Sequence, residues 1–167
     1  IKGHEYTKNI IWEIGNEDHF VYEPENYAHI VEQIILLINR LYPKDKIIVE
    51  MANSYFSGSL SKFNYNKRLV SILDKKELLD KIDYFAPHFY PERESTINTN
   101  IELKYKIKNS SPIKFEQHLV DIFPYNYSPS FFYTEVAFLK KAYTHPNYST
   151  QTHAILMMNY LISFAGS

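Results

Sequence analysis

The chain has 167 residues, of which 45% are hydrophobic and 22% charged, and its formal net charge is -1. This near-neutral charge lacks the basic patch typical of nucleic-acid-binding proteins, and no apolar run approaches the ~20 residues of a membrane-spanning helix. There is no cysteine, which excludes disulfides, thiolate catalysis and cysteine-ligated zinc. We therefore expect a globular domain with no nucleic-acid and no membrane partner.

In the first half of the chain, short apolar runs alternate with amphipathic segments. Residues 9–14 and 47–51 are apolar runs that predict buried strands. Between them, residues 24–41 place apolar side chains at three- and four-residue steps, which predicts a helix with one buried face. Residues 67–81 carry a weaker helical pattern. The order of these elements is strand, helix, strand, helix.

The second half continues this order less clearly. Residues 84–89 and 131–134 are apolar and predict two further strands, and residues 112–122 and 150–164 predict helices. Continuous apolar strands are typical of parallel sheets that helices cover, so the pattern predicts an α/β fold, either a barrel or an open sheet. None of the 4 glycines forms a GxGxxG motif, so a nucleotide-binding fold lacks its main support.

Polar side chains follow each predicted strand. Asn16 and Glu17 follow the first strand, Asn53 the second, His88 and Tyr90 the third, and Glu135 the fourth. In a parallel barrel, the active site lies at the carboxyl ends of the strands. Two carboxylates at the ends of separate strands fit glycoside hydrolysis, in which one protonates the leaving oxygen and the other attacks the sugar or activates water.

Three short motifs carry a resemblance to a known group of enzymes. Trp12-Glu13-Ile14-Gly15-Asn16-Glu17 resembles the fourth-strand motif of clan A glycoside hydrolases, in which the Asn-Glu pair supplies the acid/base. Tyr133-Thr134-Glu135 is similar to the seventh strand, which ends in the nucleophile, and Ala86-Pro87-His88-Phe89-Tyr90 is similar to the sixth. The combination most resembles the family 51 α-L-arabinofuranosidases.

This resemblance implies a (β/α)₈ TIM barrel, of which residues 1–167 form about strands 4 to 7 of a single catalytic domain without an internal boundary. The remaining strands would lie outside this chain. It implies a retaining glycosidase acting on a carbohydrate, an arabinofuranoside being favoured, with Glu17 as acid/base and Glu135 as nucleophile. The implied substrate-binding residues are Asn16, Asn53, His88 and Tyr90. We expect no cofactor and no metal, since the sequence has no His-Glu-x-x-His motif and no calcium-loop spacing.

Two alternatives remain open at this point. The chain could belong to a catalytically inactive barrel that acts as a carbohydrate-binding or scaffold protein. It could also be an open-sheet α/β enzyme of another chemistry, in which Glu17 and Glu135 would lie far apart.

Overall fold

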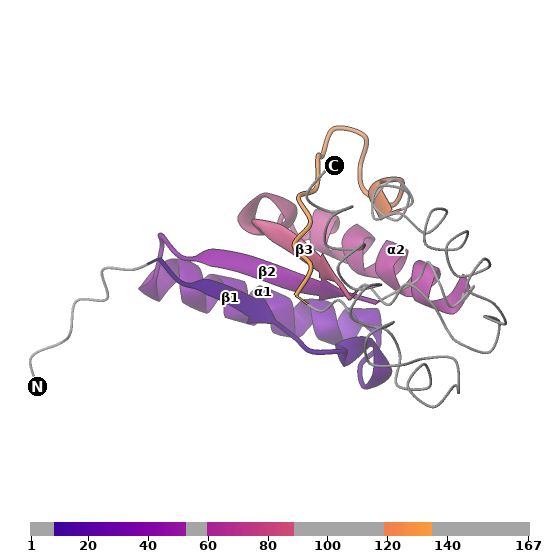
Figure 1. Ribbon diagram of the computed structural model, residues 1–167, viewed down its shortest axis with the longest axis horizontal. Coiled ribbons are helices and arrows are strands. Elements are labelled where there is room, and N and C mark those ends of the chain that lie inside the picture. Colours follow the sequence, from indigo (N-terminus) through magenta and orange to yellow (C-terminus); the bar gives the residue numbers. More distant parts are fainter. Residues whose placement is uncertain (1–8, 53–59, 89–118, 135–167) are drawn as a thin grey trace, which may run out of the picture.

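The computed structural model describes residues 9–52, 60–88 and 119–134, and these contain a three-stranded parallel sheet flanked by helices (Figure 1). The elements in chain order are β1 (Ile11–Ile14), the 3-10 helix η1 (Asp18–Phe20), α1 (Pro24–Leu41), β2 (Lys46–Met51), α2 (Leu60–Lys75), the 3-10 helix η2 (Leu79–Lys81) and β3 (Tyr84–Pro87). The strands lie in the order β1-β2-β3. The predicted α/β alternation with a parallel sheet is confirmed for these segments.

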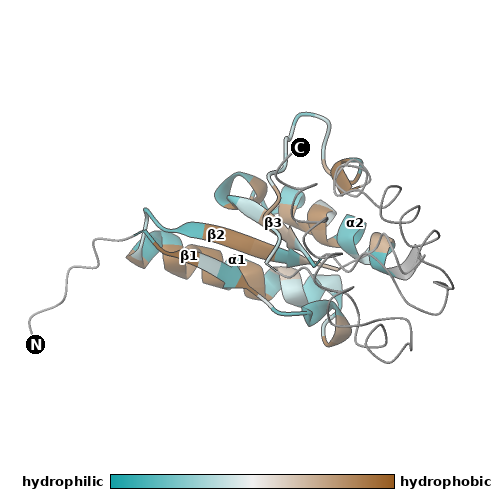
Figure 2. Ribbon diagram, in the orientation of Figure 1, coloured by the Kyte–Doolittle hydropathy of each residue, from teal (hydrophilic) through white to brown (hydrophobic). Residues whose placement is uncertain are grey.

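The core lies between the sheet and the two long helices. Alternate residues of β2, namely Ile47, Val49 and Met51, share one buried cluster with apolar residues of α1 and α2. Figure 2 shows this as hydrophobic colouring along β2 and in repeated bands on α1. Full burial of a large aliphatic side chain stabilises a fold by about 1.5–3 kcal/mol. The buried apolar residues that α1 contributes recur at three- and four-residue steps: Tyr27, Ala28, Val31, Ile35 and Ile38.

Helix α2 differs from the helix predicted at residues 67–81, because it begins at Leu60 and ends at Lys75. The polar residue Asn66 lies in its buried face, where its side chain accepts a hydrogen bond from the Ala52 amide (2.8 Å) and donates one to the Ala52 carbonyl (2.7 Å). The helix ends because Glu77 adopts a left-handed backbone (φ 55°) and the Leu78 amide donates to the Leu73 carbonyl. Hydrophobic periodicity alone showed neither boundary.

Strand β1 is more exposed than its apolar sequence predicts. Of its four residues only Ile14 is buried, and Trp12, expected in the core, is 37% exposed. The Trp12 indole donates a hydrogen bond to Asp45 (2.8 Å) and its ring stacks on Tyr42. In the described part of the sheet β1 is an edge strand that pairs with β2 only, which explains why its side chains are less covered.

An aspartate lies directly before β2 and another directly before β3. Each accepts a hydrogen bond from an amide at the start of the strand that comes before it in the chain. Asp45, just before β2, accepts a hydrogen bond from the Ile10 amide (3.1 Å). Asp83, just before β3, accepts one from the Ile47 amide (2.8 Å). Amides at the start of a strand that lack a ladder partner are thereby satisfied, which fixes the register of neighbouring strands.

The predicted strand at residues 131–134 is reduced to one parallel bridge, between Phe85 and Phe131. The Phe85 amide donates to the Ser130 carbonyl, and the Phe132 amide donates to the Phe85 carbonyl, so this segment lies on the edge of β3 opposite β2. Of the helix predicted at residues 112–122, residues 119 and 120 are helical and a turn follows. The rest of that helix and the one predicted at residues 150–164 lie outside the described residues.

The end of the described chain reaches back to β1. Because neighbouring strands are about 4.8 Å apart, a flat sheet would place the segment beside β3 about 14 Å from β1. The Thr134 hydroxyl nevertheless donates a hydrogen bond to Glu13 of β1 at 2.6 Å. The described segments therefore do not lie as a flat sheet, and Thr134, the residue that precedes Glu135, lies beside the strand that leads to Glu17.

No helix in the described segments is long and apolar enough to cross a membrane.

Candidate active site

Glu17 lies on a tight turn at the carboxyl end of β1. Its backbone is left-handed (φ 57°, ψ 31°), and Gly15, two residues earlier, has φ 100°. A non-glycine residue in this region costs of order 1 kcal/mol or more and persists only where its surroundings fix it, which is frequent at functional sites. The Glu17 carbonyl accepts a hydrogen bond from the Phe20 amide (3.0 Å), and the Glu17 side chain is 40% exposed. The turn thus presents a carboxyl group to solvent.

His88 meets Glu17 at the same end of the sheet. It follows β3, its side chain is 2% exposed, and its Nδ1 lies 3.8 Å from Glu17 Oε1. The two residues come from strands that β2 separates, so their side chains converge over the end of β2. A protonated imidazole at this distance forms an ion pair with the carboxylate.

Three of the residues that the sequence singled out therefore lie at one end of the sheet. Glu17 and His88 are brought together, and Asn16, beside Glu17, is exposed. The other three, Asn53, Tyr90 and Glu135, lie outside the described residues.

Glu50 of β2 is a buried carboxylate that the sequence reading missed. It is 2% exposed, and its Oε2 accepts a hydrogen bond from the Asp18 amide (2.9 Å). Its Oε1 lies 3.5 Å from Nδ1 of His19, whose side chain is 5% exposed. A buried carboxylate is costly unless hydrogen bonds or an opposite charge compensate it. The Asp18 amide supplies one such hydrogen bond, to Oε2, and the His19 ring is the nearest group that could carry an opposite charge. One signal was present in the sequence, namely a single acidic residue inside the apolar run 47–51.

Tyr27 of α1 joins the ends of β1 and β2. Its buried hydroxyl donates a hydrogen bond to the Ile14 carbonyl (2.6 Å) and accepts one from the Glu50 amide (3.2 Å). The space around this hydroxyl is filled, since a Cβ added at Gly15 would lie 2.6 Å from Asp18 Oδ2 and 2.7 Å from the Tyr27 oxygen. The helix, the two strands and the turn are thus packed at one point.

The titratable groups around Glu50 lie in a partly buried, negatively charged environment. Burial, and then the charge of Glu50, raises the pKa of Asp18. Burial and the charges of Glu50 and Asp18 raise the pKa of Tyr27 well above its ordinary value, and burial and Glu50 also raise the pKa of Tyr65. Both tyrosines therefore remain neutral hydroxyls over the physiological range of pH.

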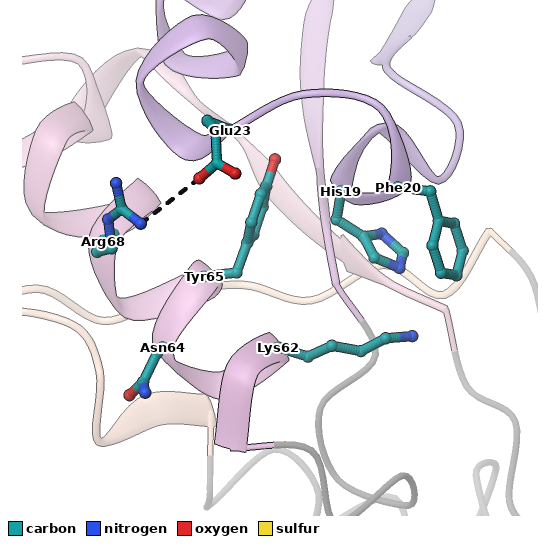
Figure 3. Close-up of a pocket in the computed structure, with 7 residues that line it drawn as sticks. All are labelled: His19, Phe20, Glu23, Lys62, Asn64, Tyr65 and Arg68. Atoms are coloured by element: carbon teal, nitrogen blue, oxygen red, sulfur yellow. Dashed lines mark ion pairs between the residues drawn. The ribbon is translucent and has the colours of Figure 1, made fainter.

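A pocket of about 470 Å³ lies beside this turn, between residues 19–23 and the first three turns of α2 (Figure 3). The centre of the exposed Phe20 ring lies 4.7 Å from the Lys62 ammonium, and Arg68 pairs with Glu23 at 3.5 Å at one side of the pocket (Figure 3). The lining thus combines two cationic side chains, one carboxylate and aromatic rings. The lining residues are His19, Phe20, Glu23, Lys62, Asn64, Tyr65 and Arg68.

Within the described ranges, no three acidic or histidine side chains are grouped so that they could hold a metal ion.

Comparison with known proteins gives a similarity of fold. No family model matches the sequence, and no curated protein matches it significantly. A solved structure that is similar to the chain is that of a family 51 α-L-arabinofuranosidase from Bifidobacterium longum, with a TM-score of 0.56 and 12% sequence identity. The match covers 92% of this chain and 35% of that enzyme, so the chain spans about a third of the enzyme's length. At this identity, the similarity shows that the chain has a fold like part of a glycoside hydrolase.

Proposed function

We propose that the chain is the part of a retaining glycoside hydrolase that carries both catalytic carboxylates, with Glu17 as acid/base and Glu135 as nucleophile. The observation that carries the proposal is the convergence of Glu17 and His88, which follow two parallel strands, at one end of the sheet. The similarity in fold to a family 51 arabinofuranosidase supports it. In parallel α/β barrels, this end of the sheet is where catalytic groups gather.

The proposed reaction is a double displacement. Glu17 donates a proton to the leaving oxygen while the Glu135 carboxylate attacks the anomeric carbon and forms a covalent glycosyl-enzyme. Glu17 then removes a proton from the water that hydrolyses this intermediate. Such enzymes hold the two carboxyl groups about 5–5.5 Å apart. The hydrogen bond between Thr134 and Glu13 supports this arrangement, because it ties the residue before Glu135 to the strand that leads to Glu17.

The neighbouring side chains have complementary roles in this proposal. His88, buried beside Glu17, orients its carboxyl group, and its imidazole compensates the negative charge that Glu17 acquires when it releases its proton. Asn16 is exposed next to Glu17 and is suited to hydrogen-bond the sugar's 2-hydroxyl, where such bonds strengthen in the transition state. Asn53 and Tyr90 are proposed to complete the sugar site.

The proposed architecture is a (β/α)₈ barrel in which this chain supplies about strands 4 to 7, and the remaining strands come from outside it. The order of the described strands supports a barrel, because β1, β2 and β3 are neighbours in chain order and a helix connects each strand to the next. An α-L-arabinofuranoside is the favoured substrate because the similar structure is an arabinofuranosidase. The pocket between residues 19–23 and α2, beside the acid/base turn, offers room for the part of the substrate that leaves.

Covalent labelling of the full gene product with a panel of mechanism-based glycosidase inactivators, followed by peptide mass spectrometry, tests the proposal. We expect a label on Glu135 from the arabinofuranosyl reagent, and no label on the Glu135→Gln variant. Glu17→Gln serves as the matched control, because it removes the acid/base and leaves the nucleophile in place. A well-folded protein that no reagent labels would reject the glycosidase and favour an inactive barrel that binds carbohydrate.

A further inference from the structure

We propose that Glu50 is a positioning residue for proton transfer, which holds the turn that carries Glu17 and is itself held by its strand and by Tyr27. This inference rests on the proposed function, since it assigns a device that serves the acid/base. Glu50 does not reach the substrate in this account. It acts on the backbone next to Glu17 and thereby fixes where the Glu17 carboxyl group points.

Glu50 is linked directly to the turn that carries Glu17. Glu50 Oε2 accepts the amide hydrogen of Asp18, the residue that directly follows Glu17. Glu17 itself is in the left-handed region, and the Phe20 amide binds its carbonyl from the other side. A left-handed glutamate is stable only where neighbouring contacts hold it, and the Asp18–Glu50 bond supplies one from outside the turn.

Glu50 is itself held firmly. Its amide donates to the Tyr27 hydroxyl, and it lies in a strand that pairs on both sides. The charged and titratable groups around its carboxylate are Asp18 and His19 of the turn, Tyr27 of α1 and Tyr65 of α2. Of these only His19 can carry a positive charge, and it lies 3.5 Å from Glu50 Oε1. Glu50 is thus a fixed point in the sheet to which the turn is attached.

Proton transfer to a leaving group depends on the acid being within hydrogen-bond reach, and a misplacement of about 1 Å can cost about 100-fold in rate. A leaving group of low basicity, such as a nitrophenolate, departs with little proton assistance, whereas an alkoxide or a sugar oxygen needs it. Loss of Glu50 should therefore act selectively on substrates with basic leaving groups.

The test compares Glu50→Leu with Glu50→Asp and Glu50→Gln in the full gene product. Leucine removes the acceptor, aspartate withdraws it by one methylene, and glutamine retains an oxygen that can bind the Asp18 amide. Asp83→Leu is the matched control, because Asp83 accepts the Ile47 amide at the opposite end of β2. Two quantities are measured: amide hydrogen exchange at residues 18–22, and kcat/KM on a nitrophenyl and an alkyl glycoside of the same sugar.

We expect Glu50→Leu to speed exchange at residues 18–22 by about tenfold or more and to lower kcat/KM on the alkyl glycoside by about 10- to 100-fold, with less than about threefold change on the nitrophenyl glycoside. Glu50→Asp should show the same pattern more weakly, Glu50→Gln should restore both quantities, and Asp83→Leu should leave exchange at residues 18–22 unchanged. If leucine prevents folding, the contrast between aspartate and glutamine decides.

Unchanged exchange in Glu50→Leu and Glu50→Asp, or equal losses of kcat/KM on both glycosides, would overturn the proposal. The exchange and kinetic measurements also distinguish failure of this proposal from failure of the proposed function. The exchange measurement needs no activity, so a wild-type protein that cleaves neither glycoside rejects the glycosidase, while exchange still decides whether Glu50 holds the turn.

Discussion

Glu17 and Glu77 adopt nearly the same left-handed backbone, with φ values of 57° and 55°, but in different settings. Glu77 follows the end of α2, where a left-handed residue is the usual way to stop a helix. Glu17 lies between a strand and a 3-10 helix, where no such rule applies. The left-handed backbone at Glu17 is therefore locally unfavourable, and the surrounding contacts offset this strain. Such a backbone is expected at a position where the side chain has a role.

We expect Glu77→Gly to stabilise the protein by up to about 1 kcal/mol, because glycine relieves the left-handed strain at an exposed site. Glu17→Gly should be no less stable than the wild type while losing acid catalysis. Chemical denaturation measures both. A loss of more than about 1 kcal/mol in Glu17→Gly would mean that the side-chain contacts of Glu17 outweigh its backbone strain.

Tyr27→Phe should destabilise the protein by about 1–3 kcal/mol, because it leaves the buried Ile14 carbonyl and Glu50 amide without their shared partner. Tyr84→Phe is the matched control, since within the described ranges its hydroxyl accepts a hydrogen bond from the exposed Lys46 ammonium alone. We expect that change to stay within about 0.5 kcal/mol. Urea unfolding of the two variants checks the difference, and equal effects would contradict it.

Asn66→Ala should cost about 2–3 kcal/mol, since both Ala52 backbone groups lose their hydrogen bonds in a buried position. Asn64→Ala, an exposed asparagine of the same helix, controls for helix propensity. It should be neutral or slightly stabilising, because alanine is the better helix former. Thermal unfolding of the pair is the measurement, and a fully stable Asn66→Ala would refute the anchoring role of this amide.

Asp18→Asn should change how stability depends on pH. Burial and the charge of Glu50 raise the pKa of Asp18 in the folded state, so the folded protein holds this proton more tightly than the unfolded chain. Asp18 therefore destabilises the fold as pH rises from its ordinary value of 3.8 through the raised one. We expect the variant to be more stable than the wild type at neutral pH, and the difference to vanish below pH 3.8. Unfolding curves of both proteins across that pH range measure the difference. A difference in the free energy of unfolding that does not change with pH would contradict this interpretation.

Much of the fold followed from hydrophobic periodicity. The α1 helix matched its predicted span, 24–41, because its apolar positions and Pro24 leave little choice. The ends of α2 did not, because one depends on Asn66 meeting the Ala52 backbone and the other on a left-handed glutamate. Those are tertiary and conformational facts that hydropathy does not encode. The exposed face of β1 was missed for a similar reason, since an edge strand reads like a central one in sequence.

For the site, sequence reasoning found the residues at the strand ends and overlooked what supports them. Glu17 and His88 were expected together and lie 3.8 Å apart. Glu50 and Tyr27 were read as members of a strand and a helix face, because a lone polar group in an apolar segment gives no sign of its partner. Their role depends on two contacts that only the folded chain reveals. Glu50 and Tyr27 are 23 positions apart in the sequence, and Glu50 and Asp18 are 32 positions apart.

The hydrogen bonds that fix the sheet differ greatly in the length of chain they enclose. The strand-start bonds of Asp45 and Asp83 join residues 35 and 36 positions apart, so each closes one strand–helix unit. The bond between Glu13 and Thr134 encloses 121 positions. Long closures cost more entropy and generally form later, so the scaffold can assemble step by step as the chain lengthens. The bond between Thr134 and Glu13 is then the last of these to form, and a chain that ended before Thr134 would hold the three-stranded sheet without this closure.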